Sequence, residues 1–117
     1  TEVDAYIADP WCGFVCTAGF FQDLLSGIAF INADSQAARI PQGLPIYLFS
    51  GAEAPVGDKT KGVQQVVDQL RRVGVKDVVV RFYVGARHEI LNETNRDEVM
   101  ADVVDWLDDH LPATDAP

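Results

Sequence analysis

His88 and Glu89 stand in the stretch "VGARHEILNE", which directly follows the apolar run "VVVRFYV". An imidazole titrates near neutral pH, so it can take up a proton and return it within one catalytic cycle. A histidine in a loop that leaves a strand is therefore a candidate general base for a nucleophile. On chain position alone, the alternative is an ordinary histidine in a surface loop.

Two β-prone runs and a helical pattern must position this histidine. Residues 46–49 and the segment "KDVVVRFYVG" at 76–85 have the apolar content of strands that are covered on both faces. Residues 62–73 between them have the spacing of a helix that packs on a sheet, and Gly74 is placed to end it. The apolar face of that helix comprises Val63, Val66, Val67, Leu70 and Val73. Strand, helix and strand in this order predict a parallel crossover.

The loops after both strands, "SGAEAPVGD" and "GARHE", emerge at the carboxyl edge of such a sheet, where ligands bind in open α/β folds. Beyond the second loop, Asn95 followed by Glu98 is a capping-box pattern and predicts the start of a last helix. The predicted buried face of that helix comprises Val99, Val103, Trp106 and Leu107.

The first third of the chain is rich in aromatic and small residues. Residues 11–31 predict one amphipathic helix, because Phe20, Phe21, Leu24, Leu25 and Ile28 recur at spacings of three and four. The polar segment 33–45 predicts a connection. Cys12 and Cys16 lack the spacing of a redox or zinc motif, so we expect two small buried apolar side chains in a reducing, cytoplasmic compartment.

Length and charge exclude several classes of protein. With 117 residues, the chain has room for a single domain. A net charge of −9 leaves no basic stripe for phosphates, so nucleic-acid binding is not expected. The apolar runs are far shorter than the roughly 20 residues of a membrane span, and we expect neither a transmembrane segment nor a signal peptide.

Two strands alone would leave an exposed hydrophobic edge, whereas parallel strands normally lie inside larger sheets. The sequence therefore predicts an α/β protein that is the C-terminal portion of a bigger sheet, either as a fragment or as one chain of a complex. The expected layout is a single partial domain. Residues 1–40 form a lid remnant and connection, 41–111 the last two strands and helices of the core, and 112–117 a tail.

Three stretches carry a resemblance to a known family: "YIADPWCGFVCTAGFFQDLL", "LPIYLFSGAEAPVGDKTKGV" and "VGARHEILNETNRDEVMADVVDWL". Together they resemble the C-terminal part of the α/β-hydrolases that include monoacylglycerol lipases, lysophospholipases and serine aminopeptidase-like enzymes. The resemblance implies a Ser-Asp/Glu-His triad that cleaves carboxylic esters, with the serine on a GxSxG elbow. It implies that His88 is the base and that no cofactor or metal is required.

The other two triad members are harder to place. The chain has no GxSxG, so the resemblance puts the serine and the oxyanion donors in N-terminal strands absent from this chain. Ala54 occupies the position where the family has its acid. Glu53 is the nearest substitute; Asp58 is another, unless it caps the following helix. A third possibility is an inactivated site. Glu89 is expected to be a helix-start charge.

The leading hypothesis is a hydrolase of lipid-like or small acyl esters that is inactive as this chain alone. Its expected partners are an ester substrate and the missing N-terminal portion of the same hydrolase. The aromatic segment at 11–30 would line an acyl-binding cleft or simply pack in the core. The alternative is a non-catalytic module that pairs with a copy of itself or another protein. Metal binding through His88, Glu89 and His110 has weak support, because His110 lies at the far end of a helix.

Overall fold

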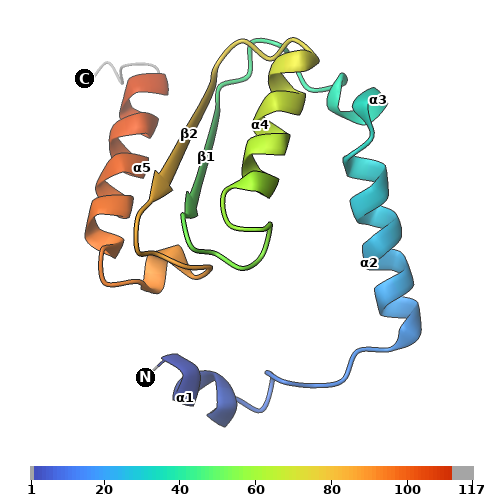
Figure 1. The fold of residues 1–117 in the computed structure, drawn as a ribbon, viewed down its shortest axis with the longest axis vertical. Helices are drawn as coiled ribbons and strands as arrows, with labels where there is room; N and C mark the ends of the chain where they lie inside the picture. Colours follow the sequence, from blue (N-terminus) through green and yellow to red (C-terminus); the bar gives the residue numbers. More distant parts are fainter. Residues whose placement is uncertain (1, 112–117) are drawn as a thin grey trace, which may run out of the picture. The chain divides into compact units, whose positions relative to one another are not determined.

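The computed structural model describes residues 2–111. Its elements are α1 (Glu2–Ala8), α2 (Ala18–Ile31), α3 (Asp34–Ala37), β1 (Ile46–Gly51), α4 (Lys61–Arg72), β2 (Val78–Tyr83), the 3-10 helix η1 (Ile90–Asn92) and α5 (Arg96–His110) (Figure 1). The chain divides into two compact units, with the boundary between Ala37 and Ala38. The first unit holds α1, α2 and α3, and the second holds the sheet.

The single helix predicted over residues 11–31 is wrong in its first part, because α2 begins only at Ala18. Thr17 precedes it in an extended conformation, and its hydroxyl accepts the backbone N–H of Phe20 at 3.1 Å, as an N-cap does. Gly13 has a φ of 73°, which a continuous helix does not allow. A threonine cap inside an aromatic segment therefore decides where this helix starts.

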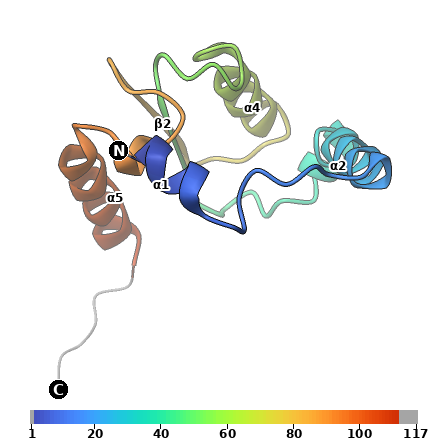
Figure 2. The same ribbon diagram turned by 90° about the horizontal axis from the view of Figure 1, so that it is seen from below.

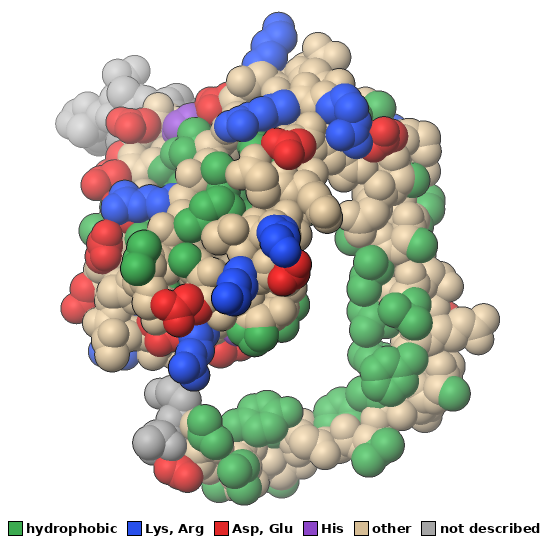
Figure 3. All heavy atoms as spheres, in the orientation of Figure 1, with side chains coloured by type: hydrophobic (Ala, Val, Ile, Leu, Met, Phe, Trp, Pro, Cys, Tyr) green, Lys and Arg blue, Asp and Glu red, His purple; other side chains and the backbone are tan. Residues whose placement is uncertain are grey.

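Apolar side chains of the first unit have no core of their own. No residue of α2 is buried, and Figure 3 shows hydrophobic side chains gathered along this unit. The expected burial of Cys12 and Cys16 is also wrong: both are partly exposed free thiols, since the stretch between α1 and α2 is built of turns. The predicted connection at 33–45 contains the one-turn helix α3.

The predicted parallel crossover is confirmed in the second unit. Strands β1 and β2 pair in parallel, with Ile46 opposite Val78 and Gly51 opposite Tyr83. Helix α4 connects them, and Gly74, with a φ of 100°, follows its end in the conformation that favours glycine. Among residues 2–111, the sheet has these two strands and no third.

Helices cover the two faces of this sheet, α4 on one side and α5 on the other (Figure 2). Side chains alternate along a strand, so every second residue of β1 and of β2 faces α4 and the residues between them face α5. The core against α4 contains Ile46, Leu48, Val67, Leu70, Val75, Val78 and Val80. The core on the side of α5 contains Phe49, Tyr83, Ala86, Ile90 and Val99.

The start of α5 is predicted correctly, but the capping box does not form. Asn95 precedes the helix without a side-chain cap bond. The Glu98 carboxylate instead accepts a hydrogen bond from the Arg81 guanidinium of β2 at 3.0 Å. The side chain of Glu98 thus bonds to Arg81 on β2 instead of to the backbone of Asn95 at the start of its own helix.

The predicted buried face of α5 is confirmed at Val99 and is incomplete at the other three residues. Val99 is fully buried and Val103 and Trp106 are half-buried, whereas Leu107 is exposed. Helix α5 meets the strands through a narrow stripe at Val99, Asp102 and Trp106, and Leu107 lies about 100° around the helix from Trp106.

The predicted tail at 112–117 lies outside the described residues. Within residues 2–111, no helix combines the length and the apolar content needed to span a membrane.

Candidate active site

The loop that follows β1 and the loop that carries His88 are joined through their backbones. The N–H of Ala52 donates to the carbonyl of Tyr83 at 2.9 Å, and the N–H of Glu53 donates to the carbonyl of Ala86 at 3.0 Å. The parallel register, which ends with Gly51 opposite Tyr83, brings these loops to the same edge of the sheet. The structure therefore places Glu53 and His88 on adjoining loops, as the sequence predicts.

Small residues make this close approach of the two loops possible. A Cβ atom added to Gly51 would overlap the carbonyl oxygens of Ala86 and Arg87. Ala54 and Ala86 are each only 1% exposed, so both methyl groups are packed between neighbours. Ala54, which stands where the acid is expected, is thus buried at the junction between the two loops.

His88 itself is exposed, five residues beyond the end of β2. The chain leaves the strand through a turn at Gly85, which has a φ of 78°, and passes His88 before entering η1. Within residues 2–111, the His88 imidazole and the Glu53 carboxylate have no hydrogen bond or ion pair, to each other or to another group. The loops are therefore brought together, while the side chains of Glu53 and His88 are not bonded to each other.

Asp58 is engaged elsewhere. Its carboxylate forms an ion pair with the Lys61 ammonium at 2.9 Å, and both side chains are more than 70% exposed. The alternative that Asp58 caps the following helix is also wrong, because Thr60 occupies the N-cap position of α4. Gly57, Asp58 and Lys59 all have positive φ angles, so this loop turns sharply ahead of α4. Among residues 2–111, the Asp58 carboxylate forms no hydrogen bond or ion pair with His88.

Glu93 is bonded to the loop that carries His88, although its spacing in the sequence does not reveal this contact. Its carboxylate accepts the backbone N–H of Arg87, the residue before His88, at 2.8 Å. Glu89 directly precedes η1 without a side-chain cap bond, so its charge stands at the start of a 3-10 helix rather than of α5. The bond closes the loop of residues 87–93, which contains η1 and has no periodic pattern in the sequence that would predict it.

A polar network anchors the end of β2, from which the His88 loop departs. The Tyr83 hydroxyl donates to Asp102 of α5 at 2.5 Å and lies 3.3 Å from the Tyr47 hydroxyl. Burial and the hydrogen bond to Asp102 raise the pKa of Tyr83 well above its ordinary value, so the phenol remains a donor. Arg81 pairs with Asp102 at 2.6 Å and covers the Tyr83 ring.

The metal hypothesis finds no support in the geometry. His110 ends α5, a helix of 15 residues that starts beyond the His88 loop and is roughly 22 Å long. Its Nε2 lies 3.0 Å from Asp77 and its Nδ1 lies 2.6 Å from the Trp106 carbonyl. Among the described residues, no group of three or more His, Cys, Asp or Glu side chains could hold a metal ion.

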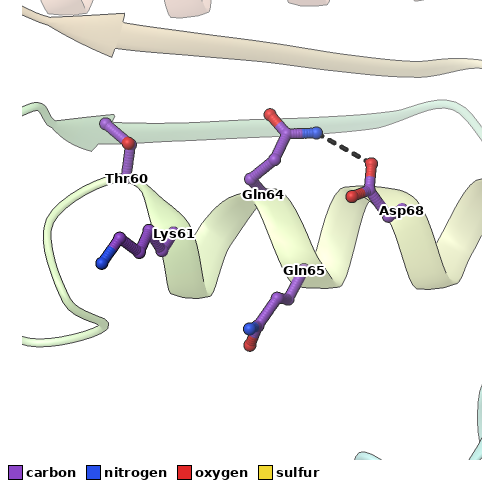
Figure 4. A pocket seen from close by; sticks show the side chains of 5 residues that line it. All are labelled: Thr60, Lys61, Gln64, Gln65 and Asp68. Carbon is purple, nitrogen blue, oxygen red and sulfur yellow. Dashed lines mark hydrogen bonds between the residues drawn. The ribbon is translucent and has the colours of Figure 1, made fainter.

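A shallow hollow lies at the start of α4, lined by Thr60, Lys61, Gln64, Gln65 and Asp68 (Figure 4). A hydrogen bond of 2.9 Å joins the Gln64 amide to Asp68. None of the predicted site residues lines this hollow.

Comparison with known proteins decides the family. The profile of the family described as serine aminopeptidase, S33, matches residues 1–95. The chain belongs to this family. A search of curated proteins gave no match.

Solved structures similar to this S33-family chain have the α/β-hydrolase fold. A carboxyl esterase from Bacillus coagulans, crystallised with glycerol, is 28% identical, with a TM-score of 0.82 over 92% of this chain. A lipase in an open form is 37% identical, with a TM-score of 0.77 over 92% of this chain. The monoacylglycerol lipase of Paleococcus ferrophilus, 24% identical, supports the fold alone, with a TM-score of 0.75 over 94% of this chain.

The S33-family chain spans only 35% of the esterase, 35% of the lipase and 40% of the monoacylglycerol lipase. It corresponds to the C-terminal portion of the fold, as predicted, without the N-terminal strands and the nucleophile elbow.

Proposed function

We propose that this chain forms part of a serine hydrolase of carboxylic esters, in which His88 is the general base. The observation that carries the proposal is the junction of the two loops at the carboxyl edge of β1 and β2, where Glu53 bonds to Ala86 and His88 follows two residues later. A carboxyl esterase and a lipase among the similar structures support an ester as substrate. A lipid-like or small acyl ester is the class we propose.

In the intact hydrolase, the serine would come from a GxSxG elbow outside this chain. The serine oxygen attacks the ester carbonyl carbon while His88 takes its proton, and the tetrahedral oxyanion is held by backbone N–H donors. The ester C–O bond then breaks, and the leaving alcohol receives the proton from His88. His88 next takes a proton from water, whose oxygen attacks the acyl carbon. The bond from that carbon to the serine oxygen then breaks, His88 returns the proton to the serine, and the carboxylic acid is released.

The acid of the triad is proposed to come from the loop after β1. Glu53 is the candidate, because its backbone is bonded to the His88 loop and its carboxylate has no other partner among residues 2–111. A carboxylate beside the histidine selects the imidazole tautomer and stabilises the imidazolium. The ion pair with Lys61 makes Asp58 the weaker candidate.

The partner that would complete the site is the N-terminal portion of the same hydrolase. Each strand of the two-stranded sheet in residues 2–111 has one free edge, and β1 is nearly all apolar. An additional parallel strand beside β1 would cover such an edge. Pairing of two copies of this chain through that edge is the alternative.

One observation favours a second candidate function. The position expected for the acid is the buried methyl group of Ala54, and no carboxylate in residues 2–111 bonds to His88. This arrangement is expected of a non-catalytic binding module derived from a hydrolase.

Labelling with a serine-directed fluorophosphonate separates these functions. The purified sample is treated with the probe, and native and denaturing mass spectrometry then identify the labelled polypeptide. The hydrolase proposal expects no label on this chain and covalent label on a GxSxG serine in the completed protein. A stable self-associated species without label in any companion polypeptide would instead establish the binding module.

A further inference from the structure

Glu93 is tied to the loop that carries His88. Its Oε1 accepts the backbone N–H of Arg87 at 2.8 Å, which closes the chain back on itself around His88. Glu93 directly follows η1 and is half-buried. A carboxylate that accepts a backbone N–H makes a charge-assisted bond, which is stronger than a bond between neutral groups.

The contacts on either side show which part of the loop this bond controls. Before His88, Ala86 is buried, and its carbonyl is fixed by the N–H of Glu53. After His88, the Ile90 side chain lies in the core that also contains Val99. The bond from Arg87 to Glu93 acts between these two anchors, one residue away from the exposed histidine.

We propose that Glu93 is a positioning residue for His88. Its carboxylate holds the peptide unit that precedes His88 and thereby fixes the direction from which the imidazole enters the site. This inference rests on the proposed function of His88 as the base. The role requires a hydrogen-bond acceptor at Glu93, because the group that it binds is a peptide N–H. The negative charge strengthens this bond, but a neutral amide oxygen can also accept it.

Two substitutions distinguish the hydrogen-bond acceptor from the negative charge. Glu93→Gln removes only the charge, whereas Glu93→Ala removes both. Amide hydrogen exchange is measured by NMR in this chain for Glu93→Ala, Glu93→Gln and the control Glu89→Ala. Loss of a charge-assisted bond is expected to speed exchange at the Arg87 amide by about 10-fold or more in Glu93→Ala. Glu93→Gln retains an amide oxygen as acceptor and is expected to keep most of the protection, and Glu89→Ala all of it. Unchanged exchange at Arg87 in Glu93→Ala would overturn the proposal.

The same variants are then assayed in the intact hydrolase. A misplaced base is expected to lower kcat roughly 10- to 100-fold in Glu93→Ala with little change in KM, and Glu93→Gln is expected to restore most of kcat. A Gln variant as impaired as the Ala variant would overturn the proposal, because the charge would then be what matters. If His88→Ala is inactive but Glu93→Ala has the wild-type kcat, the positioning role alone is overturned. If His88→Ala keeps the wild-type rate, the proposed function falls as well.

Discussion

The backbone N–H of Glu53 donates to the carbonyl of Ala86 at 3.0 Å, so the loop after β1 is fastened to the chain two residues before His88. This bond extends the pairing of two parallel strands beyond their ends. It joins the two loops within a sheet that has two strands among residues 2–111.

Gly51→Ala is expected to weaken the junction. The new Cβ would overlap the carbonyl oxygens of Ala86 and Arg87, which are backbone atoms held in the junction. Overpacking of this kind costs about 1–3 kcal/mol, and we expect the free energy of unfolding to fall by that amount in urea denaturation. Gly43→Ala is the matched control, because nothing lies within 4 Å of its added Cβ. Equal stability of the two variants would contradict the tight contact.

Ala54→Asp is expected to raise kcat in the intact hydrolase, because it returns a carboxylate to the position where the family resemblance places the acid. Loss of a triad acid lowers kcat by about four orders of magnitude in a well-studied protease, so a gain of roughly 10-fold or more is expected here. Glu53→Gln should lower kcat in the wild-type background and have little effect when combined with Ala54→Asp. Equal effects of Glu53→Gln in both backgrounds would exclude Glu53 as a substitute acid.

His110 is expected to make stability depend on pH. Nδ1 faces the Trp106 carbonyl and Nε2 faces Asp77, so both ring nitrogens can donate only when the imidazole is protonated. The hydrogen bond to Trp106 and the one to Asp77 raise the pKa of His110 above its ordinary value. The resulting stability is fully present below the unfolded pKa of about 6.5 and is lost as the pH rises through the higher folded pKa.

Urea denaturation between mildly acidic and mildly alkaline pH checks this dependence. The free energy of unfolding should fall with rising pH in the wild type and less steeply in His110→Gln. An unchanged slope in His110→Gln would show that His110 does not gain protonation on folding.

Tyr83→Phe is expected to loosen the end of β2 from α5. The hydroxyl donates to Asp102, and a hydrogen bond to a charged group contributes about 1.5–3 kcal/mol. Asp102 keeps its ion pair with Arg81, so the loss in free energy of unfolding should fall in the lower part of that range. Tyr6→Phe serves as control, because Tyr6 is exposed on α1. Thermal unfolding that is identical for both variants would show that the network does not anchor the strand.

The strands β1 and β2 and the helix α4 of the second unit could be predicted, because each is specified by the pattern of its own residues. The spacing of Val63, Val67 and Leu70 marked α4, and Gly74 marked its end. Apolar runs marked β1 and β2, and the crossover between them placed His88 at the carboxyl edge of the sheet. For these segments, periodicity and glycine conformation determine the structure without information from distant residues.

Features that depend on a tertiary contact, on an irregular loop or on a single capping residue could not be predicted in the same way. The capping box at Asn95 failed because Glu98 pairs with Arg81, a residue on another element. The role of Glu93 could not be predicted, because its bond to Arg87 closes an irregular loop that contains η1 and has no sequence signature. The number of residues between Glu53 and His88 does not tell which way the Glu53 side chain points, so the sequence could not show whether the two side chains meet. The start of α2 was misplaced because the aromatic spacing outweighed the cap at Thr17.

Steady-state hydrolysis of a chromogenic acyl ester by the intact hydrolase, with and without His88→Ala, tests the central claim most directly. His110→Ala, assayed at a pH where it is folded, controls for removal of an imidazole. The account predicts that His88→Ala lowers kcat by several orders of magnitude, with little change in KM or in the free energy of unfolding, and that His110→Ala keeps the wild-type kcat. A wild-type rate in His88→Ala would contradict the assignment of His88 as the base.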